Sequence, residues 1–149
     1  MPEETFTIFL QPDYGVGTAT SSKQYTINWE SIIPKKYKKF LLKATFTSVD
    51  NSYSTMFIKV ELTGLSTQIW DSRITGKSNL VAIAYPHDTT AFATDEYLYS
   101  TVASEISGIT VDRPNQNILT VNLYDYAHDA VAPADYTLIL QLTPIVSNP

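Results

Sequence analysis

The sequence predicts an all-β sandwich of about eight to nine antiparallel strands, and three observations lead to this fold class. Apolar and polar residues alternate with period two through nearly every apolar stretch, as in strands with one buried face. No window shows the spacing of a long helix. Turn-forming residues recur at short intervals between the apolar stretches, which is typical of sandwiches and barrels.

The alternation also predicts which side chains form the core. The side chains expected to point inward are Met56, Ile58, Val60, Leu62, Leu119, Val121, Leu123, Leu138, Leu140 and Leu142. Their neighbours Lys59, Glu61 and Thr120 are expected on the solvated face. Truncating one inward Leu or Ile to Ala should cost about 2–5 kcal/mol.

The strands are placed where alternation runs between turn signals. In chain order they are Thr5–Leu10, Lys23–Trp29, Lys38–Ser48, Thr55–Leu62, Thr67–Asp71, Ser78–Tyr85, Glu96–Val102, Gln116–Tyr126 and Asp135–Ile145, with a further short piece at Ile109–Val111. Turn chemistry separates them at Pro12–Gly17, Asp50–Ser52, Thr63-Gly64, Thr75-Gly76 and Arg113–Asn115. Glu30–Pro34 predicts one helical turn, which Pro34 prevents from running on.

Long connections favour one topology among the sandwiches. The connections Gln11–Ser22, Pro86–Asp95 and Ala127–Ala134 are too long for tight hairpins, and Greek-key folds such as the jelly roll need connections of this kind. We therefore predict a single jelly-roll domain over residues 1–149, with short flexible termini. An immunoglobulin-like sandwich is less favoured, because the sequence has no central Trp flanked by a Cys pair.

Composition and charge exclude several classes of function. The chain has no cysteine, which removes disulfides, thiolate metal sites and a Cys nucleophile. Its net charge of −5 opposes direct nucleic-acid binding, which depends on Lys and Arg. The acidic start Met1–Thr5 lacks the features of a signal peptide, and no apolar run approaches a membrane span.

Few residues suggest chemistry, so we predict no enzyme, no bound metal and no cofactor. His87 and His128 lie 41 positions apart without a third ligand at metal-like spacing, and both are read as solvated loop histidines. No Gly-x-Ser-x-Gly elbow and no phosphate-binding glycine loop occurs. Asp125, Asp129 and Asp135 suggest calcium, but turn formation is the commoner role of such residues.

Surface contacts are the more informative class of site. The interface candidates are Lys35, Lys36, Lys38, Lys39, Tyr14 and Trp70. The lysines form the one basic cluster, and a solvated edge or protein contact is favoured over DNA or lipid. Trp29 is in phase with core residues, whereas Trp70 is expected at the surface, where Trp and Tyr anchor protein or sugar contacts. Contacts are expected from loops and termini, and the best candidates are Met1–Thr5, Gln11–Ser22, Lys35–Lys39 and Pro86–Asp95.

Two passages resemble a known family. Asn28-Trp29-Glu30-Ser31-Ile32-Ile33-Pro34 follows a strand that starts near Ser22 and leads into the long strand Lys38–Ser48. This order is similar to the opening of small single jelly-roll capsid proteins of large icosahedral double-stranded DNA viruses. The pair Ile118–Asp125 and Tyr136–Ile145 resembles their final two strands.

The resemblance implies a non-enzymatic minor capsid or penton protein that binds neighbouring subunits. Its expected partners are other capsid proteins, the major capsid protein among them, and further copies of itself. Its expected location is the virion, at a vertex or between or beneath the main capsomers. A glycan-binding or receptor-binding module that uses Trp70 is the alternative.

Overall fold

The computed structural model describes residues 4–50, 57–65, 69–87, 97–101, 109–133 and 135–145. Its elements, in chain order, are β1 (Phe6–Leu10), the 3-10 helix η1 (Pro12–Tyr14), β2 (Ser22–Thr26), α1 (Trp29–Ile32), β3 (Lys39–Asp50), β4 (Ile58–Thr63), β5 (Ile69–Asp71), β6 (Gly76–Ser78), β7 (Leu80–His87), β8 (Tyr97–Thr101), β9 (Ile109–Asp112), β10 (Ile118–Tyr124) and β11 (Asp135–Pro144). Within these residues the structure is all-β, as predicted, apart from two single helical turns, of which α1 lies where one turn was expected.

The strands pair in a nested order that defines the topology. β1 pairs with β11, β2 with β10, β3 with β9 and β4 with β7, all antiparallel. Apart from β5, β6 and β8, the first strand therefore pairs with the last, the second with the second last, and so on inward. A long hairpin rolled up on itself gives this order, which is the predicted jelly roll.

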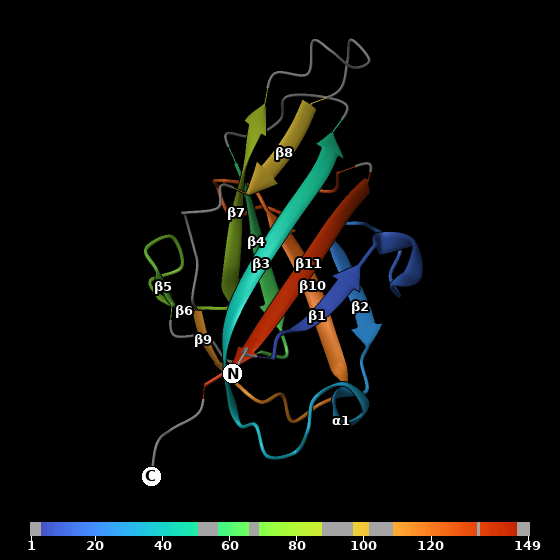
Figure 1. Ribbon diagram of the computed structural model, residues 1–149. Helices are drawn as coiled ribbons and strands as arrows, with labels where there is room; N and C mark the ends of the chain where they lie inside the picture. Colours follow the sequence, from blue (N-terminus) through green and yellow to red (C-terminus); the bar gives the residue numbers. More distant parts are fainter. Residues whose placement is uncertain are drawn as a thin grey trace.

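Two layers result from this roll. β1, β11, β3 and β9 form one layer, and β2, β10, β4 and β7 form the other. Figure 1 shows β3 and β11 crossing in front of β10 and β4. β8 pairs with both β3 and β7, so the two layers are joined along one side into a continuous curled sheet.

The core lies between the layers and follows the predicted alternation. Nine of the predicted inward side chains are fully buried: Ile58, Val60, Leu62, Leu119, Val121, Leu123, Leu138, Leu140 and Leu142. Met56 lies outside the described residues. Trp29 is also buried, but it begins α1 instead of ending a strand, and its indole Nε1 donates a hydrogen bond to the Gln116 carbonyl oxygen at 2.8 Å.

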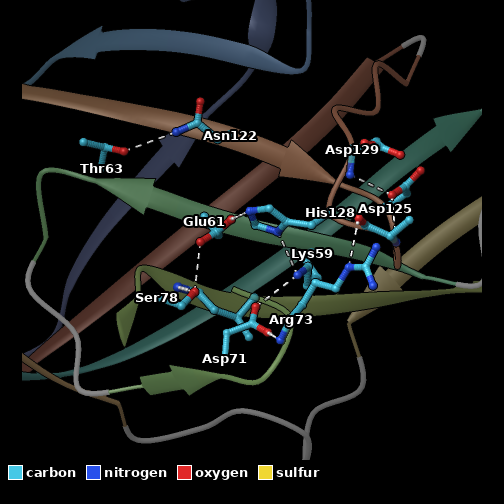
Figure 2. Close-up of polar contacts among 12 residues, drawn as sticks. Lys59, Glu61, Thr63, Asp71, Arg73, Ser78, Asn122, Asp125, His128 and Asp129 are labelled. Atoms are coloured by element: carbon cyan, nitrogen blue, oxygen red, sulfur yellow. Dashed lines mark hydrogen bonds and ion pairs between the residues drawn. The ribbon is translucent and has the colours of Figure 1, made fainter. Parts of the chain in front are cut away.

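One strand departs from the predicted two-faced character. Lys59 and Glu61 on β4 are only 5% and 8% exposed, so their prediction as solvated residues is wrong. The reason is tertiary. The β5–β6 hairpin folds back over the outer face of β4, and a loop after β10 closes over it from the other side (Figure 2). A register shift between Val60 and Glu61 in the β4–β7 pairing marks the same place.

Within the described residues, no helix is long and apolar enough to cross a membrane.

Candidate functional site

Beneath the β5–β6 hairpin lies a network of buried polar side chains centred on Lys59. The Lys59 ammonium donates to Asp71 Oδ2 at 3.0 Å and to His128 Nδ1 at 2.9 Å (Figure 2). The side chains of Lys59 and Asp71 are 6% and 11% exposed. A charge this deep is tolerated only when it is paired and hydrogen-bonded. Lys59 thus links β4, β5 and the loop after β10.

Glu61 forms the second half of this network. Its Oε1 accepts a hydrogen bond from Ser78 Oγ at 2.9 Å, and its Oε2 lies 3.9 Å from His128 Nε2. Ser78 Oγ in turn accepts from the Leu80 amide at 3.0 Å. The Ser78 hydroxyl therefore donates one hydrogen bond and accepts another. Its proton points to the Glu61 carboxylate and not to His128.

Local turn chemistry delivers His128 to this position. Asp125 Oδ1 accepts from the amides of Ala127 and Asp129, both at 2.9 Å, which is the turn-forming role predicted as the commoner one. His128 adopts a positive φ of 66°, and its ring stacks on Tyr124 with centroids 4.2 Å apart. His128 is thus packed against other side chains, and its reading as a solvated loop histidine is wrong.

The network determines which tautomer neutral His128 adopts. An ammonium has no acceptor, so Nδ1 must accept from Lys59, and the ring proton of the neutral imidazole then lies on Nε2 toward Glu61. With neutral His128 the network holds one cation against two carboxylates. Burial by itself raises the pKa of Asp71. The Arg73 amide and Lys59 outweigh burial, and they hold the pKa of Asp71 below its ordinary value.

The outer side of the same hairpin presents Trp70. Trp70 is 64% exposed and lies opposite Lys77 in the β5–β6 pairing, so its predicted surface position is confirmed. Asp71, one residue further on, points inward to Lys59. Arg73 Nε donates to the Ala127 carbonyl oxygen at 3.2 Å and fastens the turn of the hairpin to the loop that carries His128. Trp70 therefore stands on a short hairpin with an anchored base.

The predicted basic cluster lies in the connection from α1 to β3 and ends at Lys39, the first residue of β3. Lys35, Lys36, Lys38 and Lys39 are all exposed. The side chain of Arg113 holds this connection from below: Nη2 donates to the Ile33 carbonyl oxygen at 3.0 Å, and Nη1 donates to those of Pro34 and Tyr37 at 2.8 and 3.2 Å.

Further contacts fix the centre of the connection. The Arg113 amide donates to the Lys38 carbonyl oxygen at 2.7 Å. The Tyr37 hydroxyl donates to Glu4 Oε2 at 3.2 Å, and the ring of Tyr37 lies against Phe6 with centroids 6.1 Å apart. We call residues 35–39 the lysine loop. Its backbone is held in place while its four lysines are exposed, with the Lys36 ammonium 5.1 Å from the centroid of the Tyr37 ring.

The remaining predicted residues lie elsewhere. Tyr14 ends η1 and is 82% exposed. Asp135 begins β11 and accepts from the Tyr136 amide at 2.8 Å. His87 ends β7, and its side chain lies outside the described part of the structure. Within that part, no group of three or more His, Asp or Glu is placed to hold a metal ion.

Sequence reasoning missed the network because nothing local distinguishes its members. Lys59 and Glu61 alternate with core residues as solvated side chains do. The closest signal was the Asp125-x-x-His128 turn, which has the composition of an Asx turn but says nothing of where the ring points.

Comparisons with known proteins add little to this geometry. No family model matches the chain, and no curated protein matches it. Among solved structures, the chain is similar to the tripod (BppUct-A-L) from the baseplate of bacteriophage Tuc2009, with 12% identity and a TM-score of 0.35. The alignment covers 94% of this chain and 64% of that one. The fold assignment, an antiparallel jelly-roll sandwich, therefore stands on the strand pairing.

Proposed function

We propose that this chain is a non-enzymatic structural component of a virion, a minor capsid or penton protein that binds neighbouring capsid subunits. Two features support the proposal. The passage that resembles capsid proteins, Asn28–Pro34, forms the connection from the edge strand β2 to the long strand β3. The strand pairing is that of a jelly roll, as the resemblance implies.

The observation that carries the contact role is the lysine loop. Exposed lysines on a free loop pay a large conformational cost when they become ordered at an interface, and a loop already held in place avoids much of the backbone part of that cost. Arg113 and Tyr37 hold this one. The rest of the chain is acidic, which disfavours nucleic acid as the partner. The four lysines themselves favour an acidic protein surface.

Incorporation into particles tests the proposal. The variant K36E/K38E reverses two exposed charges of the lysine loop, and K43E/K77E changes the net charge equally on β3 and β6. Particles are purified from cells in which each variant replaces the wild-type protein. We expect K36E/K38E to be depleted from particles and K43E/K77E to be retained. A wild-type chain that never copurifies with particles contradicts the proposal.

One observation favours a second candidate, a receptor-binding or glycan-binding module. Trp70 is exposed on a hairpin whose inner side is fastened by the Lys59–Asp71 ion pair, and an aromatic ring on a rigid support is suited to stacking on a sugar or anchoring a protein contact. Binding to a glycan array by the wild-type chain, lost in W70A and kept in F9A, would support this candidate. Phe9 is a matched control because it is 57% exposed on β1.

A further inference from the structure

The lysine loop and an acidic surface lie at opposite ends of the long strands. At one end of β11, Pro144 pairs with Phe40, and the Ile145 amide donates to the Lys39 carbonyl oxygen at 2.9 Å. At the other end Asp135 pairs with Val49. A strand of this length spans about 30 Å. Figure 1 shows the chain after α1 at the lower end and the start of β11 at the upper end.

The upper end combines carboxylates with exposed apolar side chains. η1 contacts β11, and Thr20 Oγ1 donates to the Pro133 carbonyl oxygen at 2.6 Å, so the loop after η1 is tied to the segment that enters β11. Asp13 and Asp135 are both exposed here. Between β1 and β2, Tyr14 and Val16 are 82% and 73% exposed. We call Asp13, Tyr14 and Asp135 the acidic end.

The two ends differ in charge. The lysine loop carries four lysines, whereas the acidic end carries two exposed carboxylates beside Lys23, whose ammonium donates to the Gly17 carbonyl oxygen at 2.6 Å. The lysine loop holds four of the ten basic residues, which leaves six basic against fifteen acidic residues, a net charge of −9, in the rest of the chain. An exposed aromatic ring beside charged groups is the composition of a protein interface with a polar rim. Opposite charges on the two ends favour encounter between copies and fix their orientation.

We infer that the lysine loop of one copy binds the acidic end of a second copy, head to tail. The two surfaces differ and lie at opposite ends, so the contact is heterologous, and each copy keeps one free surface for the next. Repetition gives a ring when the rotation closes and a linear array when it does not. The inference rests on the proposed function only in taking the lysine loop as a protein-contact surface.

Self-association of the purified chain tests the inference without particles. Sedimentation velocity over a range of concentrations should show reversible association that weakens as salt rises, because salt screens exposed charges. K36E/K38E and D13K/D135K should each raise the dissociation constant by roughly tenfold or more. The first cancels the net charge of the lysine loop, and the second places positive charges against the four lysines. K43E/K77E, with the same net charge as K36E/K38E, should associate like the wild type.

The decisive variant combines both reversals in one chain. K35E/K36E/K38E/K39E/D13K/D135K has an acidic loop at one end and two lysines at the other, so its ends are complementary again and it should regain association. An equimolar mixture of K35E/K36E/K38E/K39E with D13K/D135K should also associate. Circular dichroism checks that each variant folds, and D13K alone replaces the double change if Asp135 proves necessary for folding. A wild-type chain that stays monomeric, or a folded charge-swapped chain that does not associate, overturns the inference. Association without incorporation into particles would instead defeat the proposed function alone.

Discussion

The phenolic oxygens of Tyr25 and Tyr136 lie 2.6 Å apart in the interior of the sandwich. Tyr25 comes from β2 and Tyr136 from β11, so this hydrogen bond joins one layer to the other. The two side chains are 6% and 2% exposed. Two polar groups that would each be costly to bury alone satisfy one another here.

Removing both hydroxyls should therefore cost less than the two single removals added together. Y25F or Y136F leaves a buried hydroxyl without its partner, and each should lower the free energy of unfolding by about 1–3 kcal/mol. The double variant Y25F/Y136F should lose clearly less than the sum of the two. Urea denaturation of the four proteins completes the cycle. Additive losses would mean that the bond contributes nothing of its own.

Alkaline pH should destabilise the fold through the same pair. Burial raises the pKa of both Tyr25 and Tyr136 above the ordinary value. Their contribution is fully present below about pH 10, the pKa in the unfolded chain, and is lost as pH rises further, because only the unfolded chain then ionises. Each phenol that stays protonated in the folded state should lower the free energy of unfolding by about 1.4 kcal/mol per pH unit above pH 10. Urea midpoints from pH 8 to 11 should fall more steeply for the wild type than for Y25F/Y136F.

The Lys59–Asp71 ion pair should be expensive to break from one side. K59M leaves the Asp71 carboxylate nearly buried without its cation, and it should cost about 3–5 kcal/mol. K59M/D71L removes both charges and should cost less than K59M alone, because no uncompensated charge remains. K43M is the matched control, since Lys43 is an exposed lysine on β3. Equal losses of unfolding free energy in K59M and K43M would show that the Lys59–Asp71 ion pair does not contribute to stability.

Acid should weaken the same anchor. The Arg73 amide and Lys59 hold the pKa of Asp71 below its ordinary value, so the contribution of Asp71 to stability is fully present above about pH 4, the unfolded value. It is lost as pH falls through the lower pKa of the folded state. The difference in unfolding free energy between wild type and D71N should be constant from pH 7 to 5 and shrink below pH 4. A difference in unfolding free energy that grew on acidification would mean that the pKa of Asp71 is raised in the folded state and not lowered.

Period-two alternation predicted the strands and the core because a strand with one buried face needs an apolar residue at every second position. β10 and β11 show this pattern with alternate buried residues along their whole length. The pattern fails where a second segment covers the outer face. Lys59 and Glu61 are buried by a hairpin and a loop that follow later in the chain, and alternation within β4 carries no information about them.

The surface candidates divide in the same way. Exposure of Trp70 and of the lysines followed from their local context, since Trp70 stands next to the charged residues Asp71 and Arg73 and the lysines follow one another. The hydrogen bonds from Arg113 that hold the lysine loop could not be predicted from local context. Arg113 follows β9, far from Lys35–Lys39 in sequence, and only the β3–β9 pairing brings its guanidinium under Ile33 and Pro34.

The bridging position of β8 makes the two sides of the molecule mechanically unequal. Where β8 pairs with β3 and β7, a continuous ladder of backbone hydrogen bonds connects one layer to the other. On the opposite side the described strands end at β1 and β2, and no ladder joins these two edges. The Tyr25–Tyr136 hydrogen bond and the contact of η1 with β11 connect the layers on that side. Amide hydrogen exchange should accordingly be faster in β1 and β2 than in β3 and β11, with the layers parting from the open side.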